Sequence, residues 1–230
     1  MVSLYNVIVD WIPGLPRIPY RRGVGQWEGV VMHQTANPHD TARSERAYEA
    51  TTFENAFVHE FIDPGEIVQV ANPNYIAYGA GAKANPRFIH LELCSAQTRE
   101  QFNRSFDRWC QRAAYFLTRR HLPVIAAKSD GSGTLWSHDQ VSRYLGGTNH
   151  EDPIAYLAQW GVTWPDVLAA VQRHHDAITG GDEVMLSAKD ANAIIAFLAA
   201  AYNATASQEA RDEFHRLANE LRKASGQPPE

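Results

Sequence analysis

Cysteine is scarce in this sequence, with two residues among 230. Two thiols cannot build a disulfide scaffold, and Cys94 and Cys110 cannot be paired from their positions. In a chain made in a reducing compartment, we expect both to be free thiols. An excess of charge of one sign is also missing, since 21 Lys and Arg oppose 26 Asp and Glu. A net charge of −5 gives no general attraction to phosphate backbones. The composition therefore predicts no nucleic-acid partner.

Long apolar runs are absent as well. No stretch of about 18 consecutive apolar residues occurs, so the sequence predicts no membrane insertion. Near the N-terminus, Asp10, Pro13 and Pro16 interrupt the apolar residues before they could form a signal-peptide core, and we expect no signal peptide. The 230 residues, 44% of them hydrophobic, are enough for one large domain with a small addition.

Short apolar runs bounded by turn residues predict strands. Residues 29–35 (GVVMHQT) are β-rich and end in polar residues, which predicts a buried strand with His33 at its C-terminal end. The runs 56–62 and 66–71 flank the turn sequence Asp63-Pro64-Gly65. We expect these two runs to form a hairpin.

The segment 88–94 (FIHLELC) alternates between two faces. A period of two puts Phe88, His90, Glu92 and Cys94 on one face and three aliphatic residues on the other. This predicted strand therefore has one face for packing and one face that can carry chemistry.

Helical periodicity begins at Thr98 and continues to Arg120, where apolar residues recur every three or four positions. A second helical stretch runs from Ile154 to about His174. Four arginines in the first stretch fall mostly off the apolar positions, and we interpret them as a solvated helix face rather than a DNA-binding surface. They are Arg104, Arg108, Arg112 and Arg119.

The composition changes near residue 180. The residues from Thr179 to Asp182 are typical of a linker, and beyond them the sequence becomes Ala-rich and helical, with Ser187 and Ser207 as N-caps of two helices. Two helices bury little by themselves, so this segment needs the main domain, a second copy of itself or an external partner. The expected organisation is a main domain, a linker and a helical C-terminal segment, at residues 1–178, 179–186 and 187–230.

Ten histidines contrast with the two cysteines. Histidine is the commonest metal ligand and a common general acid or base near neutral pH. Zinc is bound by histidine nitrogens and carboxylate oxygens, and a catalytic zinc site keeps one of four positions for water. His33, His138 and Asp152 supply that number of ligands, although their spacing alone is compatible with many arrangements. The candidates at predicted strand ends and in polar loops are His33, His90, Glu92, His138, His150 and Asp152.

Three motifs and one hairpin carry a resemblance to a known family. The motifs are VVMHQTA, FIHLELC and SHDQVSRYLGGTNHEDPIAYLAQWG, in that order, and the hairpin is DPGEIVQV. Together they resemble the zinc-dependent N-acetylmuramoyl-L-alanine amidases of the amidase-2 type, particularly bacteriophage endolysins, over roughly residues 5–175. The resemblance implies an α/β fold in which a central mixed β-sheet is flanked by helices and a metal lies in a groove on one sheet face.

The resemblance also implies a site and a reaction. On the family pattern, His33, His138 and Asp152 bind one Zn²⁺ per chain and Glu92 is the catalytic carboxylate. The implied reaction is hydrolysis of the amide bond between N-acetylmuramic acid and L-alanine in bacterial peptidoglycan, with Glu92 transferring the proton. An endolysin is expected to stay in the host cytoplasm until the membrane is permeabilised and then to degrade the cell wall.

His150 departs from the family pattern, because many relatives have a lysine two residues before the third ligand. Both side chains can donate a hydrogen bond to a developing oxyanion, so His150 is the second candidate catalytic residue. Other interpretations stay open. His150 could be the ligand, with Asp152 a carboxylate at a helix N-terminus, and Glu92 could orient a ligand rather than act as a base. His59 and His90 are expected to be partly buried structural residues.

A non-catalytic peptidoglycan-binding protein of the same fold is the alternative function. Loss of the third ligand would be its sign, and Asp152 is present. The C-terminal helices resemble no wall-binding repeat, but endolysins commonly place a binding module after the catalytic one, so we expect these helices to target the wall. A homodimer formed through them is the other interpretation.

Overall fold

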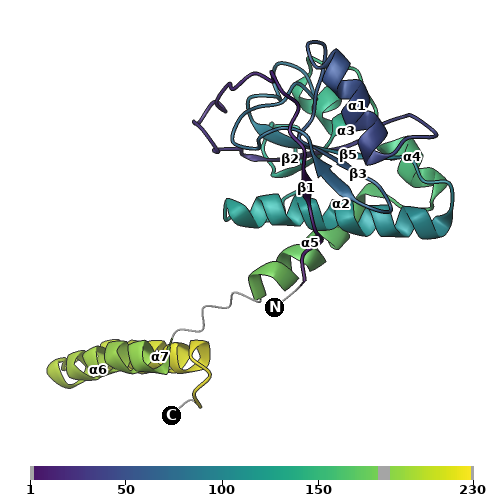
Figure 1. The fold of residues 1–230 in the computed structure, drawn as a ribbon. Helices are drawn as coiled ribbons and strands as arrows, with labels where there is room; N and C mark the ends of the chain where they lie inside the picture. Colours follow the sequence, from purple (N-terminus) through teal and green to yellow (C-terminus); the bar gives the residue numbers. More distant parts are fainter. Residues whose placement is uncertain (1–2, 181–186, 229–230) are drawn as a thin grey trace. The chain divides into compact units, whose positions relative to one another are not determined.

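A computed structural model describes residues 3–180 and 187–228, and its contacts divide the chain into two units, Met1–Gly181 and Asp182–Glu230. The described residues of the first unit form a six-stranded sheet in the order β1-β4-β3-β5-β2-β6. Figure 1 shows β2, β3 and β5 of this sheet next to α2. β3 and β4 pair antiparallel, and the other neighbouring strands pair parallel. The strands are β1 (Ile8–Val9), β2 (Gly29–Gln34), β3 (Glu60–Ile62), β4 (Ile67–Gln69), β5 (Phe88–Leu93) and β6 (Leu135–Ser137).

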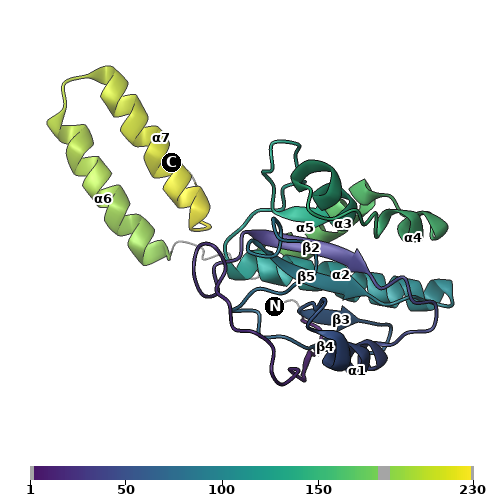
Figure 2. The same cartoon turned by 90° about the horizontal axis from the view of Figure 1, so that it is seen from above.

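Helices cover both faces of this sheet. Residues of α2 and α5 join Ile62 and Leu91 in one core cluster, whereas α1 packs over Phe61 and Val68 on the opposite face. Figure 2 shows α1 beside β3 and β4, and α3 beside β2. The mixed sheet flanked by helices that the resemblance implies is therefore confirmed. The helical elements are α1 (Ala42–Thr52), α2 (Arg99–Arg119), α3 (His138–Gln140), the π-turn η1 (Val141–Leu145), α4 (Ile154–Gln159) and α5 (Trp164–Gly180).

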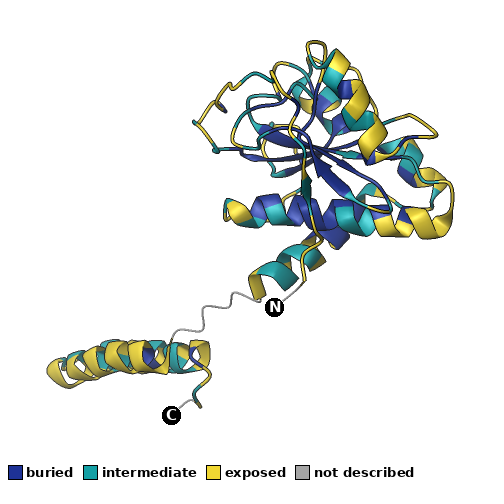
Figure 3. Ribbon diagram, in the orientation of Figure 1, coloured by how far each residue is buried: buried dark blue, intermediate teal, exposed yellow. Residues whose placement is uncertain are grey.

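The alternation predicted for residues 88–94 is confirmed in β5. Ile89, Leu91 and Leu93 lie in the core on the side of α2, and the indole of Trp109 on α2 donates a hydrogen bond to the Leu91 carbonyl at 3.1 Å. His90 and the other alternate residues point to the opposite face. Figure 3 shows these central strands as the most deeply buried part of the first unit. One sheet face is thus used for packing, which leaves the other for the site.

The ends of α2 agree with the predicted helix, but one of its arginines does not lie on a solvated face. Thr98 accepts a hydrogen bond from the Gln101 N–H and caps the first turn. Arg112, expected to be solvated, is buried and binds Glu60 through two hydrogen bonds of 2.8 and 2.6 Å. The physical reason is that Glu60 is itself fully buried on β3, and a buried carboxylate needs a cationic partner.

The helical stretch predicted from Ile154 to about His174 consists of two helices in the structure, α4 and α5, with a break between them. Between them Gly161 has a φ of +64°, a left-handed conformation that ends helices. The Val162 N–H bonds back to the Leu157 carbonyl at 3.0 Å, which closes the end of α4.

The helix α5 extends further than the sequence predicts. Thr179 and Gly180, expected to begin the linker, belong to this helix, and the Thr179 hydroxyl donates to the His175 carbonyl at 2.8 Å. Residues 181–186, the rest of the expected linker, lie outside the described residues.

Five elements have no counterpart among the sequence predictions, namely β1, β6, α1, α3 and η1. α1 has a local signal, because Thr41 and Ser44 form a reciprocal capping box at its N-terminus. β1 has two residues and β6 has three, so neither is long enough to show a recognisable period.

The second unit contains α6 (Ala188–Ala204) and α7 (Gln208–Ala224), and the two predicted N-caps are confirmed. Ser187 accepts a hydrogen bond from the Asp190 N–H, and Ser207 accepts one from the Ala210 N–H. Most side chains of these helices are exposed, including Phe197 at 77%. Across the described part of both units, we find no helix with the length and apolar character needed to cross a membrane.

A candidate metal centre at the edge of the parallel strands

Three parallel strands bring two predicted ligands to one edge of the sheet. β2 lies between β5 and β6 and is parallel to both, so the carboxyl ends of the three strands meet. His33 lies near the end of β2, and β6 ends at Ser137, immediately before His138. Ser137 and Gln140 cap α3 reciprocally, which fixes His138 in the first turn.

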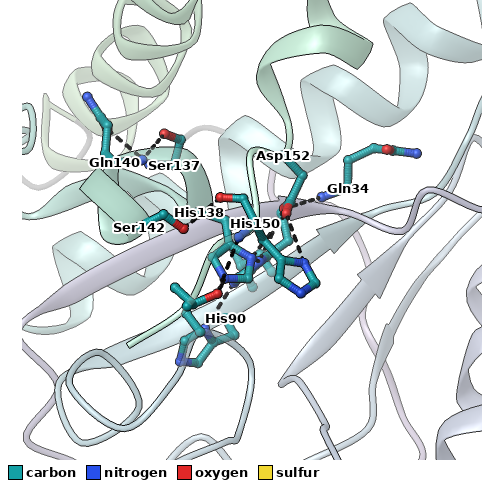
Figure 4. A network of polar contacts seen from close by, with 12 residues as sticks. Gln34, His90, Ser137, His138, Gln140, Ser142, His150 and Asp152 are labelled. Atoms are coloured by element: carbon teal, nitrogen blue, oxygen red, sulfur yellow. Dashed lines mark hydrogen bonds and ion pairs between the residues drawn. The ribbon is translucent and has the colours of Figure 1, made fainter. Parts of the chain in front are cut away.

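Donor atoms of three side chains converge at this edge. His33 Nδ1 lies 3.0 Å from His138 Nδ1 and 3.4 Å from Asp152 Oδ2. The other carboxylate oxygen of Asp152 lies 3.1 Å from His138 Nδ1. Figure 4 shows His138 and Asp152 meeting, with His150 close by. Each of the three side chains offers one atom within 4.8 Å of the others, so the expected ligands come together in space.

Two hydrogen bonds from backbone N–H groups hold Asp152 in place. The Asp152 backbone carbonyl accepts a hydrogen bond from the Asp139 N–H at 3.0 Å, and its Oδ2 accepts one from the Gln34 N–H at 3.3 Å. Upstream, Gly146 and Gly147 have φ values of +70° and +87°, a conformation that favours glycine. These two glycines let the chain turn back toward the strand edge after η1.

The electrostatic environment favours the deprotonated forms of His33 and Asp152. Burial lowers the pKa of His33 to about 4, so its ring is neutral near pH 7. Burial alone would raise the pKa of Asp152, but hydrogen bonds from His138 and His33 outweigh it and hold that pKa well below its usual value. Neutral imidazole and ionised carboxylate are the forms that bind metal ions.

Glu92 lies beside His33 on the same sheet face, since the two residues are register partners across β5 and β2. Its Oε2 atom is buried and has no hydrogen-bond partner among the residues that the structure describes. Burial, and after it the negative charge of Asp152, raises the pKa of Glu92 well above its usual value. A raised pKa makes a carboxyl group a stronger base, which suits it to accept a proton and return it.

His150 lies on the solvent side of the cluster. Its side chain is 67% exposed, and its ring stacks on the ring of His138 with centroids 4.7 Å apart. His150 Nδ1 is 3.8 Å from Asp152 Oδ1, beyond hydrogen-bond distance. The atoms that converge most closely therefore include a carboxylate oxygen of Asp152 and exclude the His150 ring.

Sequence reasoning missed the contacts of two further histidines near the site, His90, which lies next to His33, and His59, which lies next to His90. His90 Nδ1 is 3.0 Å from His33 Nε2, and the ring of His59 stacks on that of His90. Both are fully buried rather than partly buried as expected, because His90 lies on β5, which is paired on both sides, and His59 is hydrogen-bonded to the His90 backbone. Burial lowers the pKa of His59 to about 4 and that of His90 well below 6.5. The alternation that puts His90 on the face of Glu92 is the signal that could have identified the contact.

A groove of about 340 Å³ runs from the cluster along one side of α1. Glu49 lies in its wall, where one carboxyl oxygen accepts a hydrogen bond from the Val58 N–H at 2.8 Å. The other oxygen is buried without a partner in the described part of the chain, and burial raises the pKa of Glu49 to about 8. A volume of this size lies within the usual range of ligand-binding pockets. Its lining includes Glu92, His138, His150 and Asp152 at one end, and Glu45, Tyr48 and Glu49 of α1.

The donor set fits zinc. Two imidazole nitrogens and one carboxylate oxygen are ligand types that zinc accepts, and three protein ligands leave the fourth position of a catalytic site for water or substrate. Ligand atoms of a tetrahedral zinc ion lie roughly 3.3 Å apart, close to the 3.0–3.4 Å between the donor atoms here. The second ring nitrogen of each histidine also has a partner. His33 Nε2 lies 3.0 Å from His90 Nδ1, and His138 Nε2 lies 2.9 Å from the hydroxyl oxygen of Thr148. Histidine ligands are commonly fixed in this way.

Comparison with known proteins adds independent information. A family model described as N-acetylmuramoyl-L-alanine amidase matches residues 23–155, a range that includes all five predicted site residues. Protein Ami of Listeria monocytogenes is 39% identical over 211 residues, which are 92% of this chain and 23% of Ami. The bifunctional autolysin of Staphylococcus aureus is 42% identical over 148 residues, 64% of this chain and 12% of the autolysin. The chain thus spans less than a quarter of the length of these relatives.

Solved structures resemble the first unit. The hydrolase AmiA of Staphylococcus aureus, solved in complex with its ligand, is 35% identical and has a TM-score of 0.75, with 78% of this chain and 87% of AmiA covered. The catalytic domain of XlyA has the same fold at 20% identity, with a TM-score of 0.54 and coverage of 72% of this chain and 99% of that domain. From the family model and AmiA together, we conclude that the chain belongs to the N-acetylmuramoyl-L-alanine amidase family.

Proposed function

We propose that this protein is a zinc-dependent peptidoglycan hydrolase that cleaves the amide bond between N-acetylmuramic acid and the L-alanine of the stem peptide. One observation carries the proposal. The donor atoms of His33, His138 and Asp152 converge at a groove that Glu92 also lines, and Glu92 Oε2 is buried with no hydrogen-bond partner in the described part of the chain. Membership of the amidase family supports the choice of bond and substrate.

The proposed mechanism assigns proton transfer to Glu92. When bound by His33, His138 and Asp152, zinc supplies a Lewis acid that polarises the carbonyl and makes water a better nucleophile. Glu92 accepts a proton from water as the water oxygen bonds to the lactyl carbonyl carbon. Glu92 then gives this proton to the amide nitrogen as the carbon–nitrogen bond breaks. The products are a free muramic acid carboxylate and a peptide with a free alanine amino terminus.

His150 has a second role in the proposal. Its exposed ring lies at the edge of the groove and is stacked on His138, so a substrate can reach it. A hydrogen bond from this ring would stabilise the oxyanion of the tetrahedral intermediate. The wall formed by α1 would lie along the stem peptide, which places Tyr48 and Glu45 beside the substrate.

Metal analysis joined to product analysis on purified cell walls tests this function. We expect one zinc ion per chain and the release of new alanine amino termini, which stops when a chelator removes the metal. Glu92→Gln should keep the metal and release no amino termini. If zinc-loaded protein leaves walls intact and Glu92→Gln behaves identically, the hydrolase is excluded. Wall binding that resists the chelator would then favour the alternative, a non-catalytic binding protein.

We further propose that the reaction serves host lysis by a bacteriophage endolysin, which the sequence motifs support. The match to the bifunctional autolysin favours a bacterial autolysin as the second candidate. Synthesis of the protein inside a susceptible bacterium tests the endolysin role. We expect an intact culture until the membrane is permeabilised and rapid loss of turbidity afterwards. A culture that survives permeabilisation would contradict the proposal.

For the second unit we propose targeting of the cell wall, with homodimer formation as the second candidate. The two helices leave Ile194, Phe197 and Tyr202 exposed, and a groove of about 220 Å³ lies between them. Exposed apolar surface of this kind favours a partner. The match to Protein Ami covers 211 residues of this chain and therefore extends into these helices.

Deletion of residues 183–230 distinguishes the two roles of the second unit. Targeting predicts a loss of wall affinity with no change in the subunit number in solution. Dimer formation predicts the opposite result, unchanged wall affinity and conversion of a dimer to a monomer, measured by light scattering. Cleavage of a soluble muropeptide provides the control and should persist in the truncated chain.

A further inference from the structure

Two buried histidines extend the polar network from His33 into the sheet. His33 Nε2 lies 3.0 Å from His90 Nδ1. His59 is joined to His90 twice, because its N–H donates to the His90 carbonyl and its Nδ1 accepts from the His90 N–H, both at 3.0 Å. The rings of His59 and His90 stack with an interplanar angle of 4°, and all three histidines are at most 1% exposed. Figure 4 shows His90 beneath His138 and Asp152.

These contacts fix the positions of the ring protons. Since His59 Nδ1 accepts a hydrogen bond, its proton lies on Nε2, which donates to the Tyr75 carbonyl at 3.0 Å. If His33 Nδ1 is a ligand atom, the His33 proton lies on Nε2 and His90 Nδ1 must accept it. The remaining proton of His90 then lies on Nε2, a buried atom that lacks a hydrogen-bond partner among the described residues.

We propose that His90 is a positioning residue, which holds His33 in the tautomer and ring orientation that present Nδ1 to zinc. This inference rests on the proposed zinc site. Packing alone does not account for a histidine here, because an apolar side chain would leave no buried nitrogen without a partner. Acceptance of the His33 proton does account for it, since histidine ligands are commonly fixed through their second nitrogen.

Gly79 supports the same arrangement by leaving space for the ring. A Cβ atom at position 79 would lie 2.8 Å from both Cγ and Nδ1 of His90. The ring of His90 therefore occupies the space that any side chain at position 79 would need. Gly79→Ala must displace this ring, although it removes no hydrogen-bonding group.

Zinc affinity tests the proposal without any substrate, by competition between the protein and a chromophoric chelator. His90→Phe keeps a ring but removes the acceptor, so we expect its zinc affinity to fall about 10- to 100-fold. His90→Gln offers an amide oxygen to His33 and should restore part of the affinity. Gly79→Ala is expected to weaken zinc binding as well. His39→Phe, at an exposed loop histidine, is the matched control and should bind zinc as the wild type does.

Nitrogen NMR of the zinc-loaded wild-type protein provides a readout that needs no substitution. We expect the Nε2–H tautomer of His33 and a scalar coupling across the hydrogen bond to His90 Nδ1. Wild-type zinc affinity in His90→Phe, or a spectrum without this coupling, would overturn the proposal. If His90→Phe does not fold, the coupling alone decides. A wild-type protein that binds no zinc would instead overturn the proposed metal site, so the two failures are distinguishable.

Discussion

His33 and Glu92 are paired residues of the neighbouring parallel strands β2 and β5. Adjacent strands lie about 4.8 Å apart, so the first expected ligand and the expected proton carrier are neighbours on one sheet face. Backbone hydrogen bonds set this spacing, and no loop has to close to create it. A substitution at Glu92 can therefore change the chemistry without moving the donor set.

Glu92→Gln should lower the rate constant of amide cleavage by about 10² to 10⁴, because an amide cannot accept and return the proton. Its zinc affinity should equal that of the wild type, since Glu92 is not among the three converging ligand residues. Steady-state kinetics on a soluble muropeptide and a zinc titration measure the two quantities. Activity near that of the wild type would remove Glu92 from the mechanism.

Asp152→Ala and His150→Ala separate the roles of ligand and catalyst. We expect Asp152→Ala to lose zinc binding and, with it, activity. His150→Ala should keep zinc while kcat falls by about 10² to 10³, the usual effect of removing one oxyanion donor. Metal content and kcat are measured on the same preparations. The reverse pattern, with zinc lost only in His150→Ala, would make His150 the third ligand.

Glu49 should make the wild-type protein less stable as the pH rises. Burial raises its pKa from 4.5 to about 8 in the folded protein. The folded state therefore holds the proton more tightly than the unfolded state between these values. The contribution of Glu49 to the free energy of unfolding is therefore largest below pH 4.5. It falls by up to about 1.4 kcal/mol per pH unit until the pH exceeds the folded-state pKa of about 8.

Glu49→Gln tests this dependence, because glutamine keeps the acceptor for Val58 and does not titrate. Between about pH 5.5 and about pH 8, urea unfolding should show the variant gaining roughly 3 kcal/mol relative to the wild type. Other titrating groups are common to both proteins and cancel in the difference. Equal pH slopes for the two proteins would show that Glu49 ionises normally.

Arg112→Met should lower the free energy of unfolding by about 3–5 kcal/mol, because it leaves the carboxylate of Glu60 buried without its partner. Denaturant unfolding measures the loss. Arg104→Met is the matched control on the same helix, where the pair with Glu100 is exposed, and it should change stability by less than about 1 kcal/mol. Similar values for both variants would contradict the importance of burial.

The elements that the sequence predicts well have a long, regular pattern. Residues 88–94 alternate strictly and form β5, and residues 98–120 keep a helical spacing and form α2. β1 has two residues and therefore no period. The break at Gly161 was missed because a glycine that ends a helix looks the same in sequence as one tolerated within a helix.

The site could be predicted only in part, because its contacts are set by strand order. His33 and His138 are 105 residues apart in the sequence, and no local pattern predicts that their side chains contact each other. The resemblance supplied that prediction. The burial of Arg112 depends on Glu60 from a different strand, and the contact of His90 depends on the pairing of β2 with β5. Tertiary structure decides both.

The separation of the ligands along the chain has a consequence for the lifetime of the protein. An ion held by His33, His138 and Asp152 would act as a removable cross-link between segments that are distant in sequence. Because such an ion binds the folded chain and not the unfolded one, zinc at about a thousand times its dissociation constant would add about 4 kcal/mol of stability. Metal supply would then govern how long the first unit resists unfolding and proteolysis, as well as whether it can act.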